Sequence, residues 1–178
     1  MGVGARIGQW LLEWLKERMT EPVFQGRSLH ETQSLLRLLV HAMQADGDDS
    51  VAEQQLVEFL AAHIPKSWRL SDGAPLWQAI TAEAQAIDTE GDRLAAACAA
   101  AASLEDAELR RRAYEMAEMI FQATPTAPAV YRRWHAPLAT ALQIPEDQRE
   151  AWAAAAARDY EFRLRHEVAE LFVDGDAL

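Results

Sequence analysis

The stretch from Leu35 to Ile64 constrains the fold most, because it reads as a helix, a sharp acidic break and a second helix. Apolar residues recur at helical spacing along one face of the first half: Leu35, Leu36, Leu39, Val40 and Met43. Gly47 follows them, where a helix commonly ends in a left-handed conformation that glycine adopts without strain. Ser50 and Glu53 have the spacing of a capping box, which opens the next helix. The stretch therefore predicts two consecutive amphipathic helices joined by a tight corner.

Four acidic side chains crowd into the corner between these two helices: Asp46, Asp48, Asp49 and Glu53. Carboxylates beside a helix N-terminus stabilise it, because that end carries partial positive charge. Carboxylate oxygens are also the ligands that Ca²⁺ and Mg²⁺ prefer. The corner is not an EF-hand, because Gly47 follows Asp46 at once and Val57 stands where that loop needs its bidentate glutamate. It is either plain helix-end chemistry or a weak site for a divalent cation.

This corner resembles the tellurite-resistance TerB-like family, in which a helix ends in Ala-Asp-Gly, as at residues 45–47, before a capping box opens the next helix. The stretch from Ala95 to Phe121 is similar to that family's alanine-rich helix, acidic turn and arginine-bearing helix. The resemblance implies a bundle of two pseudo-repeated helix groups and a non-enzymatic role in stress response. The equivalent second corner, at residues 124–128, has no carboxylate. A metal site with ligands from both halves is therefore not implied.

The sequence predicts an all-α protein, because every long segment keeps helical periodicity and no run of Val, Ile and Thr has period two. About seven or eight helices should include one TerB-like helical domain over residues 23–173, with a frayed acidic tail at 174–178. Ser28 and Ser103 each precede an acid by three positions and are expected to cap helices. Pro137 is expected to interrupt or bend a helix. The side chains expected in the core are Trp14, Leu39, Phe59, Ile80, Met116, Ile120 and Leu164.

Residues 1–22 read as an amphipathic helix that Pro22 ends, with Trp10 and Trp14 on its apolar face. Burying that face against the core, or against a second copy in a homodimer, is the favoured interpretation. Peripheral contact with a membrane is the alternative, because tryptophan and leucine on one face suit an interface. The charges on this helix nearly balance, so its attraction to anionic lipid would be weak.

The formal net charge of −11 disfavours nucleic acid as a partner, because binding phosphates requires clustered lysine and arginine. It favours cations and basic partners instead. The single cysteine, Cys98, excludes an internal disulfide. We find no cleaved secretion signal and no apolar run long enough to span a membrane, so a cytoplasmic location is expected.

No motif in the sequence indicates catalysis. His166-Glu167 begins like the zinc motif H-E-x-x-H, but Glu170 replaces its second histidine. The main prediction is therefore a helical module that docks other proteins without enzymatic activity. The alternative is an enzyme whose site is assembled in a helical cleft from scattered residues such as His41, Glu118 and His135.

Overall fold

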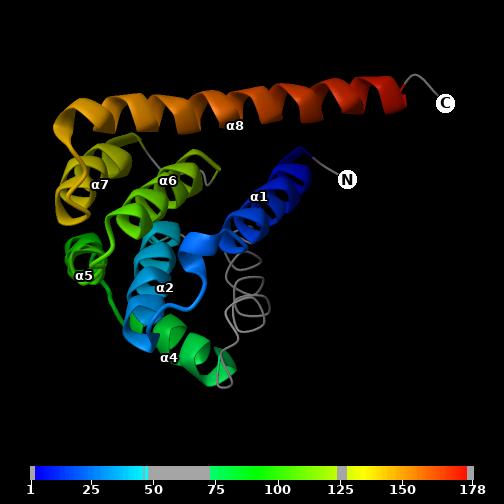
Figure 1. The fold of residues 1–178 in the computed structure, drawn as a ribbon. Helices are drawn as coiled ribbons and strands as arrows, with labels where there is room; N and C mark the ends of the chain where they lie inside the picture. The colour runs from blue at the N-terminus through cyan, green and yellow to red at the C-terminus, as the bar shows by residue number, and fades with distance from the viewer. Residues whose placement is uncertain (1–2, 46, 48–72, 124–127, 176–178) are drawn as a thin grey trace.

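The computed structural model describes residues 3–45, 47, 73–123 and 128–175 of the chain. These ranges contain seven α-helices and one short 3₁₀ helix and no strand, which confirms the all-α prediction. In chain order (Figure 1) the elements are α1 (Val3–Met19), η1 (Pro22–Phe24), α2 (Leu29–Met43), α4 (Gly73–Gln85), α5 (Glu90–Ala102), α6 (Ala107–Ala123), α7 (Pro128–Ala141) and α8 (Glu146–Gly175).

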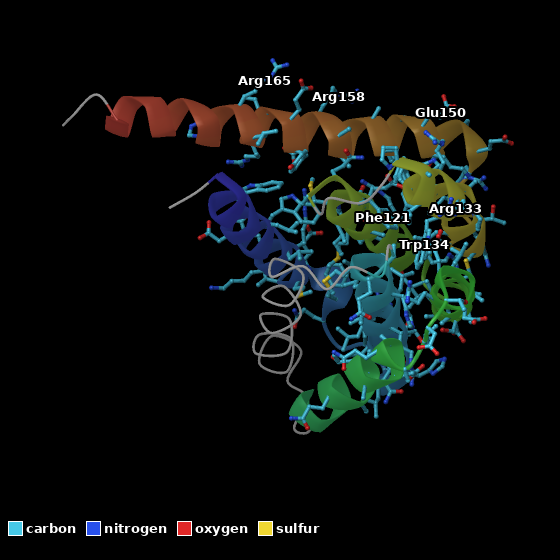
Figure 2. The ribbon with its side chains drawn as sticks, turned by 180° about the vertical axis from the view of Figure 1, so that it is seen from behind. Phe121, Arg133, Trp134, Glu150, Arg158 and Arg165 are labelled. Carbon is cyan, nitrogen blue, oxygen red and sulfur yellow. The ribbon has the colours of Figure 1, made fainter. Side chains whose placement is uncertain are left out.

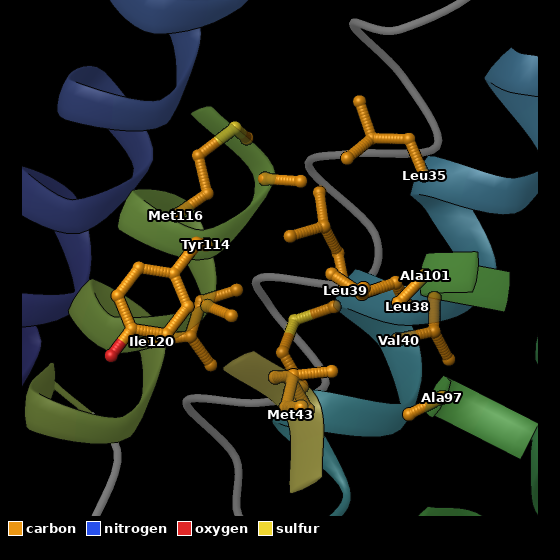
Figure 3. Packing of buried hydrophobic residues seen from close by; sticks show 14 of the residues in the cluster. Leu35, Leu38, Leu39, Val40, Met43, Ala97, Ala101, Tyr114, Met116 and Ile120 are labelled. Carbon is orange, nitrogen blue, oxygen red and sulfur yellow. The ribbon is translucent and has the colours of Figure 1, made fainter. Parts of the chain in front are cut away.

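Helix α2 lies at the centre and contacts α4, α5 and α6. Its buried side chains include Leu38 and Leu39, which are fully covered (Figure 3). Helix α5 approaches closely because its facing residues, Ala97 and Ala101, have almost no side chain to hold the two axes apart. Helix α6 covers another side of α2 with larger residues such as Met116. Most of the hydrophobic core therefore gathers around α2.

Aromatic and ionic contacts hold helix α7 against the bundle, and two of them come from adjacent residues. The buried ring of Trp134 lies edge-on to Phe121 of α6, with 6.0 Å between the ring centroids (Figure 2). Arg133, the next residue back along the chain, forms a two-nitrogen ion pair with Glu90 at the start of α5. Together these contacts tie α7 to both of its neighbours.

Helices α1 and α8 form an outer layer over α6. Helix α8 is 30 residues long, and it runs across α6 and α1 and extends past them (Figure 1). On α1, Leu11 and Leu15 are buried, and the ring of Trp10 lies 6.3 Å from that of Tyr160 on α8. The apolar face of the N-terminal helix therefore packs against α6 and α8 of its own chain.

Four of the expected core residues are buried: Leu39, Ile80, Met116 and Ile120. Trp14 and Leu164 are only partly buried, and Trp14 packs against the edge of the core. Trp14 lines an opening between α1, α6 and α8, and Leu164 lies beyond Tyr160, the residue of α8 that meets Trp10. Phe59 lies outside the described residues.

The helix boundaries follow the predicted caps with one correction, at Ser103. Ser28 forms the expected capping box with Glu31. Ser103 ends α5 instead of opening α6, because its hydroxyl donates to the carbonyl of Ala100. Helix α7 continues through Pro137, which lies on its exposed side.

Candidate binding cleft and a buried glutamate–histidine pair

A cleft of about 440 Å³ opens where α1, α6 and α8 meet. Tryptophan side chains from two helices form part of its wall, Trp14 from α1 and Trp152 from α8. The space exists because α8 presents only Ala155 and Ala156 between its larger residues there. The remaining lining residues are Arg18, Arg111, Arg112, Glu115, Met119 and Asp159.

A guanidinium group of the chain lies over the ring of each tryptophan in the cleft. The Cζ atom of Arg18 lies 5.2 Å from the ring centroid of Trp14, and that of Arg111 lies 5.3 Å from Trp152. These are cation–π distances, at which the negative face of the ring attracts a positive group. Trp152 also lies 6.2 Å from the ring of Tyr114. The two indoles are therefore held in place by neighbours.

The arginines of the cleft are compensated by glutamates. Arg18 pairs with Glu21 at 2.9 Å, and Arg111 pairs with Glu115 at 3.1 Å. Arg112 pairs with Glu115 at 2.8 Å and also reaches Glu21 at 3.1 Å and Glu108 at 3.3 Å.

Asp159 is different, because it makes no ion pair with any residue that the structure describes. Three arginines thus face three glutamates and one further, exposed carboxylate. The charge around the cleft is slightly negative.

A second polar group lies beneath the surface of α6 and α7. Glu118 is 1% exposed, and one of its oxygens lies 2.8 Å from Nδ1 of His135. Its other oxygen accepts a hydrogen bond from the hydroxyl of Tyr131, also at 2.8 Å. The hydroxyl of Tyr114 lies 3.4 Å from the same histidine nitrogen. Each carboxylate oxygen therefore has a partner, as a buried charge requires.

These contacts shift the ionisation of the groups involved. The hydrogen bond to Glu118 raises the pKa of His135, because the carboxylate stabilises the protonated ring. Burial and the charge of Glu118 raise the pKa values of Tyr114 and Tyr131, so both phenols stay neutral at physiological pH. With Nδ1 turned toward Glu118, the other ring nitrogen of His135 is the one left for proton exchange.

The structure brings together two of the three residues predicted for an enzyme site. Glu118 and His135 meet, but His41 belongs to a different part of the bundle. It is buried in α2, where burial lowers its pKa and the nearest charges are those of Glu83, Arg37 and Arg93. The structure therefore places Glu118 and His135 together, and no described hydrogen bond joins His41 to them.

The four acids of the predicted cation site, Asp46, Asp48, Asp49 and Glu53, lie outside the described residues. Gly47, between two of them, has the expected left-handed backbone, with φ of +79°. A guanidinium nitrogen of Arg93 lies 2.8 Å from where a Cβ on this glycine would stand, so a larger residue would displace the end of that side chain. In the ranges the structure describes, no cluster of three or more His, Cys, Asp or Glu side chains has the arrangement of a metal site.

The sequence predictions did not include the cleft. Trp14 was expected in the core, and nothing in the sequence indicated that it meets Trp152 and Arg111 around one opening. One signal was available, because Trp152 and Asp159 are seven residues apart and so share a face of a helix. Their meeting with Trp14 depends on the packing of α1 against α8, which no local pattern specifies.

No protein-family model matches this sequence, and neither a curated protein nor a solved structure is similar to it. None of the helices described is both long and apolar enough to cross a bilayer.

Proposed function

We propose that this chain is a non-enzymatic helical interaction module, which binds a segment of a partner protein in the cleft between α1, α6 and α8. The observation that carries the proposal is the pair of half-buried tryptophans, Trp14 and Trp152, on the walls of one opening. Tryptophan and arginine dominate the energetics of protein interfaces, because they combine a large apolar surface with a polar group. The surrounding ion pairs would form the polar rim.

The TerB-like resemblance supports a cytoplasmic stress-response setting for such a module. In that setting the acids at Asp46, Asp48, Asp49 and Glu53 would bind Ca²⁺ or Mg²⁺ weakly, at one end of α2. The cation would be separate from the docking cleft, which uses α1, α6 and α8.

A displayed library of random peptides, selected against the full chain, tests the docking proposal. Ala155→Tyr adds a large side chain to a residue that lines the cleft, whereas Ala154→Tyr adds the same side chain to an exposed residue outside the lining. We expect selected peptides to lose binding to the first variant and to keep it with the second. Circular dichroism checks that both variants remain folded. If no selected peptide distinguishes the two variants, the cleft is not a docking site.

The contact between Glu118 and His135 favours a second candidate, general acid–base catalysis. A carboxylate that orients an imidazole is a common arrangement in hydrolases. The other hydrogen-bonding neighbours of this histidine, among the described residues, are tyrosines whose raised pKa makes them poor nucleophiles. Hydrolysis of a panel of activated esters, compared between the natural chain and His135→Gln, tests this candidate. Equal rates would exclude it.

A further inference from the structure

The partner segment that fits the cleft is basic. Building on the proposed function, we infer that an arginine or lysine side chain of the partner enters between Trp14 and Trp152 and pairs with Asp159. The inference concerns the chemistry of the occupant, and it follows from the aromatic walls and from the distribution of charge around them.

The aromatic walls favour a cation. Both indoles already attract guanidinium groups of the chain itself, with Arg18 at 5.2 Å from one ring centroid and Arg111 at 5.3 Å from the other. Both rings also line the open space, so an occupant touches them too. A positive group placed against either indole is attracted by the electron-rich face of the ring.

The charges around the cleft point the same way. Glu21, Glu108 and Glu115 compensate the three arginines through direct ion pairs of 2.8–3.5 Å. An acidic occupant would meet arginines whose charge these glutamates already compensate, and it would lie close to Asp159 in the same lining. A basic occupant finds that carboxylate exposed and without an ion-pair partner among the described residues. The net charge of −11 also attracts basic segments from a distance.

The short peptide acetyl-Gly-Arg-Gly-amide, titrated into the full chain labelled with ¹⁵N at tryptophan, tests the inference. We expect the indole N–H signals of Trp14 and Trp152 to shift saturably. The citrulline peptide, which has nearly the same shape without the charge, should bind much more weakly. The acidic control acetyl-Gly-Glu-Gly-amide should leave both signals in place.

Asp159→Asn removes the carboxylate that is inferred to pair with the partner's cation. It should weaken binding of the arginine peptide by about two- to fivefold, the loss expected for one exposed ion pair. Asp88→Asn makes the same change of net charge at an exposed position between α4 and α5, and it should leave the affinity unchanged. Equal affinities for these two variants, or a saturable shift with the glutamate peptide, would overturn the inference. So would the absence of any saturable shift with the arginine peptide.

The peptide library separates failure of this inference from failure of the proposed function. Peptides that depend on the cleft but lack arginine and lysine would overturn the basic partner and leave the docking function standing. If no peptide depends on the cleft, both are overturned. Enrichment of arginine or lysine among peptides that Ala155→Tyr rejects supports both.

Discussion

Glu118 is a buried carboxylate whose two oxygens have different partners, His135 on one side and Tyr131 on the other. The packing of α7 on α6 depends on this group, because it satisfies polar atoms that burial would otherwise leave unpaired. The sequence placed Glu118 and His135 among the residues of one possible site, but without the tyrosines. Glu118 and His135 are 17 residues apart and on different helices, so only the packing of α7 on α6 reveals their contact.

Replacing Glu118 with glutamine should lower the free energy of unfolding by about 1.5–3 kcal/mol at pH 5.5, the usual loss for a hydrogen bond to a charged group. The folded pKa of His135 is raised by Glu118. The stability from this pair is therefore complete below the unfolded pKa of about 6.5, and it is lost as the pH rises through the folded value. Urea melts from pH 5.5 to 8.5 measure this decline, which Glu118→Gln should flatten.

His30→Gln is the control, because His30 lies exposed at the start of α2. It should keep the decline of stability seen in the natural chain. If Glu118→Gln declines as steeply as the natural chain, the glutamate does not hold the proton on His135.

At the scale of the elements, sequence predicts best where the signal is local. The capping box at Ser28 was predicted and is confirmed, because all of its hydrogen bonds lie within four residues. Ser103 had the same local signal, but its hydroxyl also lies 2.7 Å from that of Ser34 on α2. The cap of α6 is instead Asp106, which accepts from the amide of Leu109 at 2.9 Å. Ser103 thus contacts a distant helix, and α6 is capped by Asp106, which has no acid three positions on.

Asp106→Ala should destabilise the protein by about 0.5–2 kcal/mol, the usual range for loss of an N-cap. Asp106→Asn should cost less, because its amide oxygen can still accept from Leu109. The hydrogen bond from that amide lowers the pKa of Asp106, so its contribution is present above the unfolded pKa and is lost as the pH falls through the folded value. Thermal melts at pH 7 compare the two variants, and equal losses would contradict the cap.

Helix α1 gives a second test at this scale. Leu15 is fully buried against the rest of the chain, and Leu15→Ala should cost about 2–5 kcal/mol through lost apolar contact and the cavity left behind. The adjacent Lys16 is exposed, and Lys16→Ala should change stability by less than about 0.5 kcal/mol. Urea unfolding measures both. A small effect of Leu15→Ala would mean that α1 detaches easily from its own domain.

At the scale of the whole molecule, the helical class followed from periodicity, but the cleft did not. Apolar spacing identifies which face of a helix is buried, and this sufficed for α2 and α6. The cleft depends on where Trp14, Arg111 and Trp152 meet, and these residues lie in three helices far apart in the chain. Half-burial of Trp14 and of Leu164 has the same origin, because α1 and α8 cover each other only in part.

The net charge of −11 gives the whole molecule a repulsion that any salt should screen, which allows the acidic corner to be tested separately. Sodium chloride should raise the melting temperature by screening alone. We expect calcium chloride at matched ionic strength to raise it further, because a cation that binds only the folded chain adds RT ln(1 + [L]/Kd), roughly 1.4 kcal/mol at tenfold excess over Kd. Magnesium chloride tests whether the effect is shared by both ions.

The double variant Asp46→Asn/Asp48→Asn should be more stable without divalent ions, since it relieves repulsion between carboxylates, and it should lose the extra calcium response. Identical shifts with all three salts would identify these acids as helix-end structure alone.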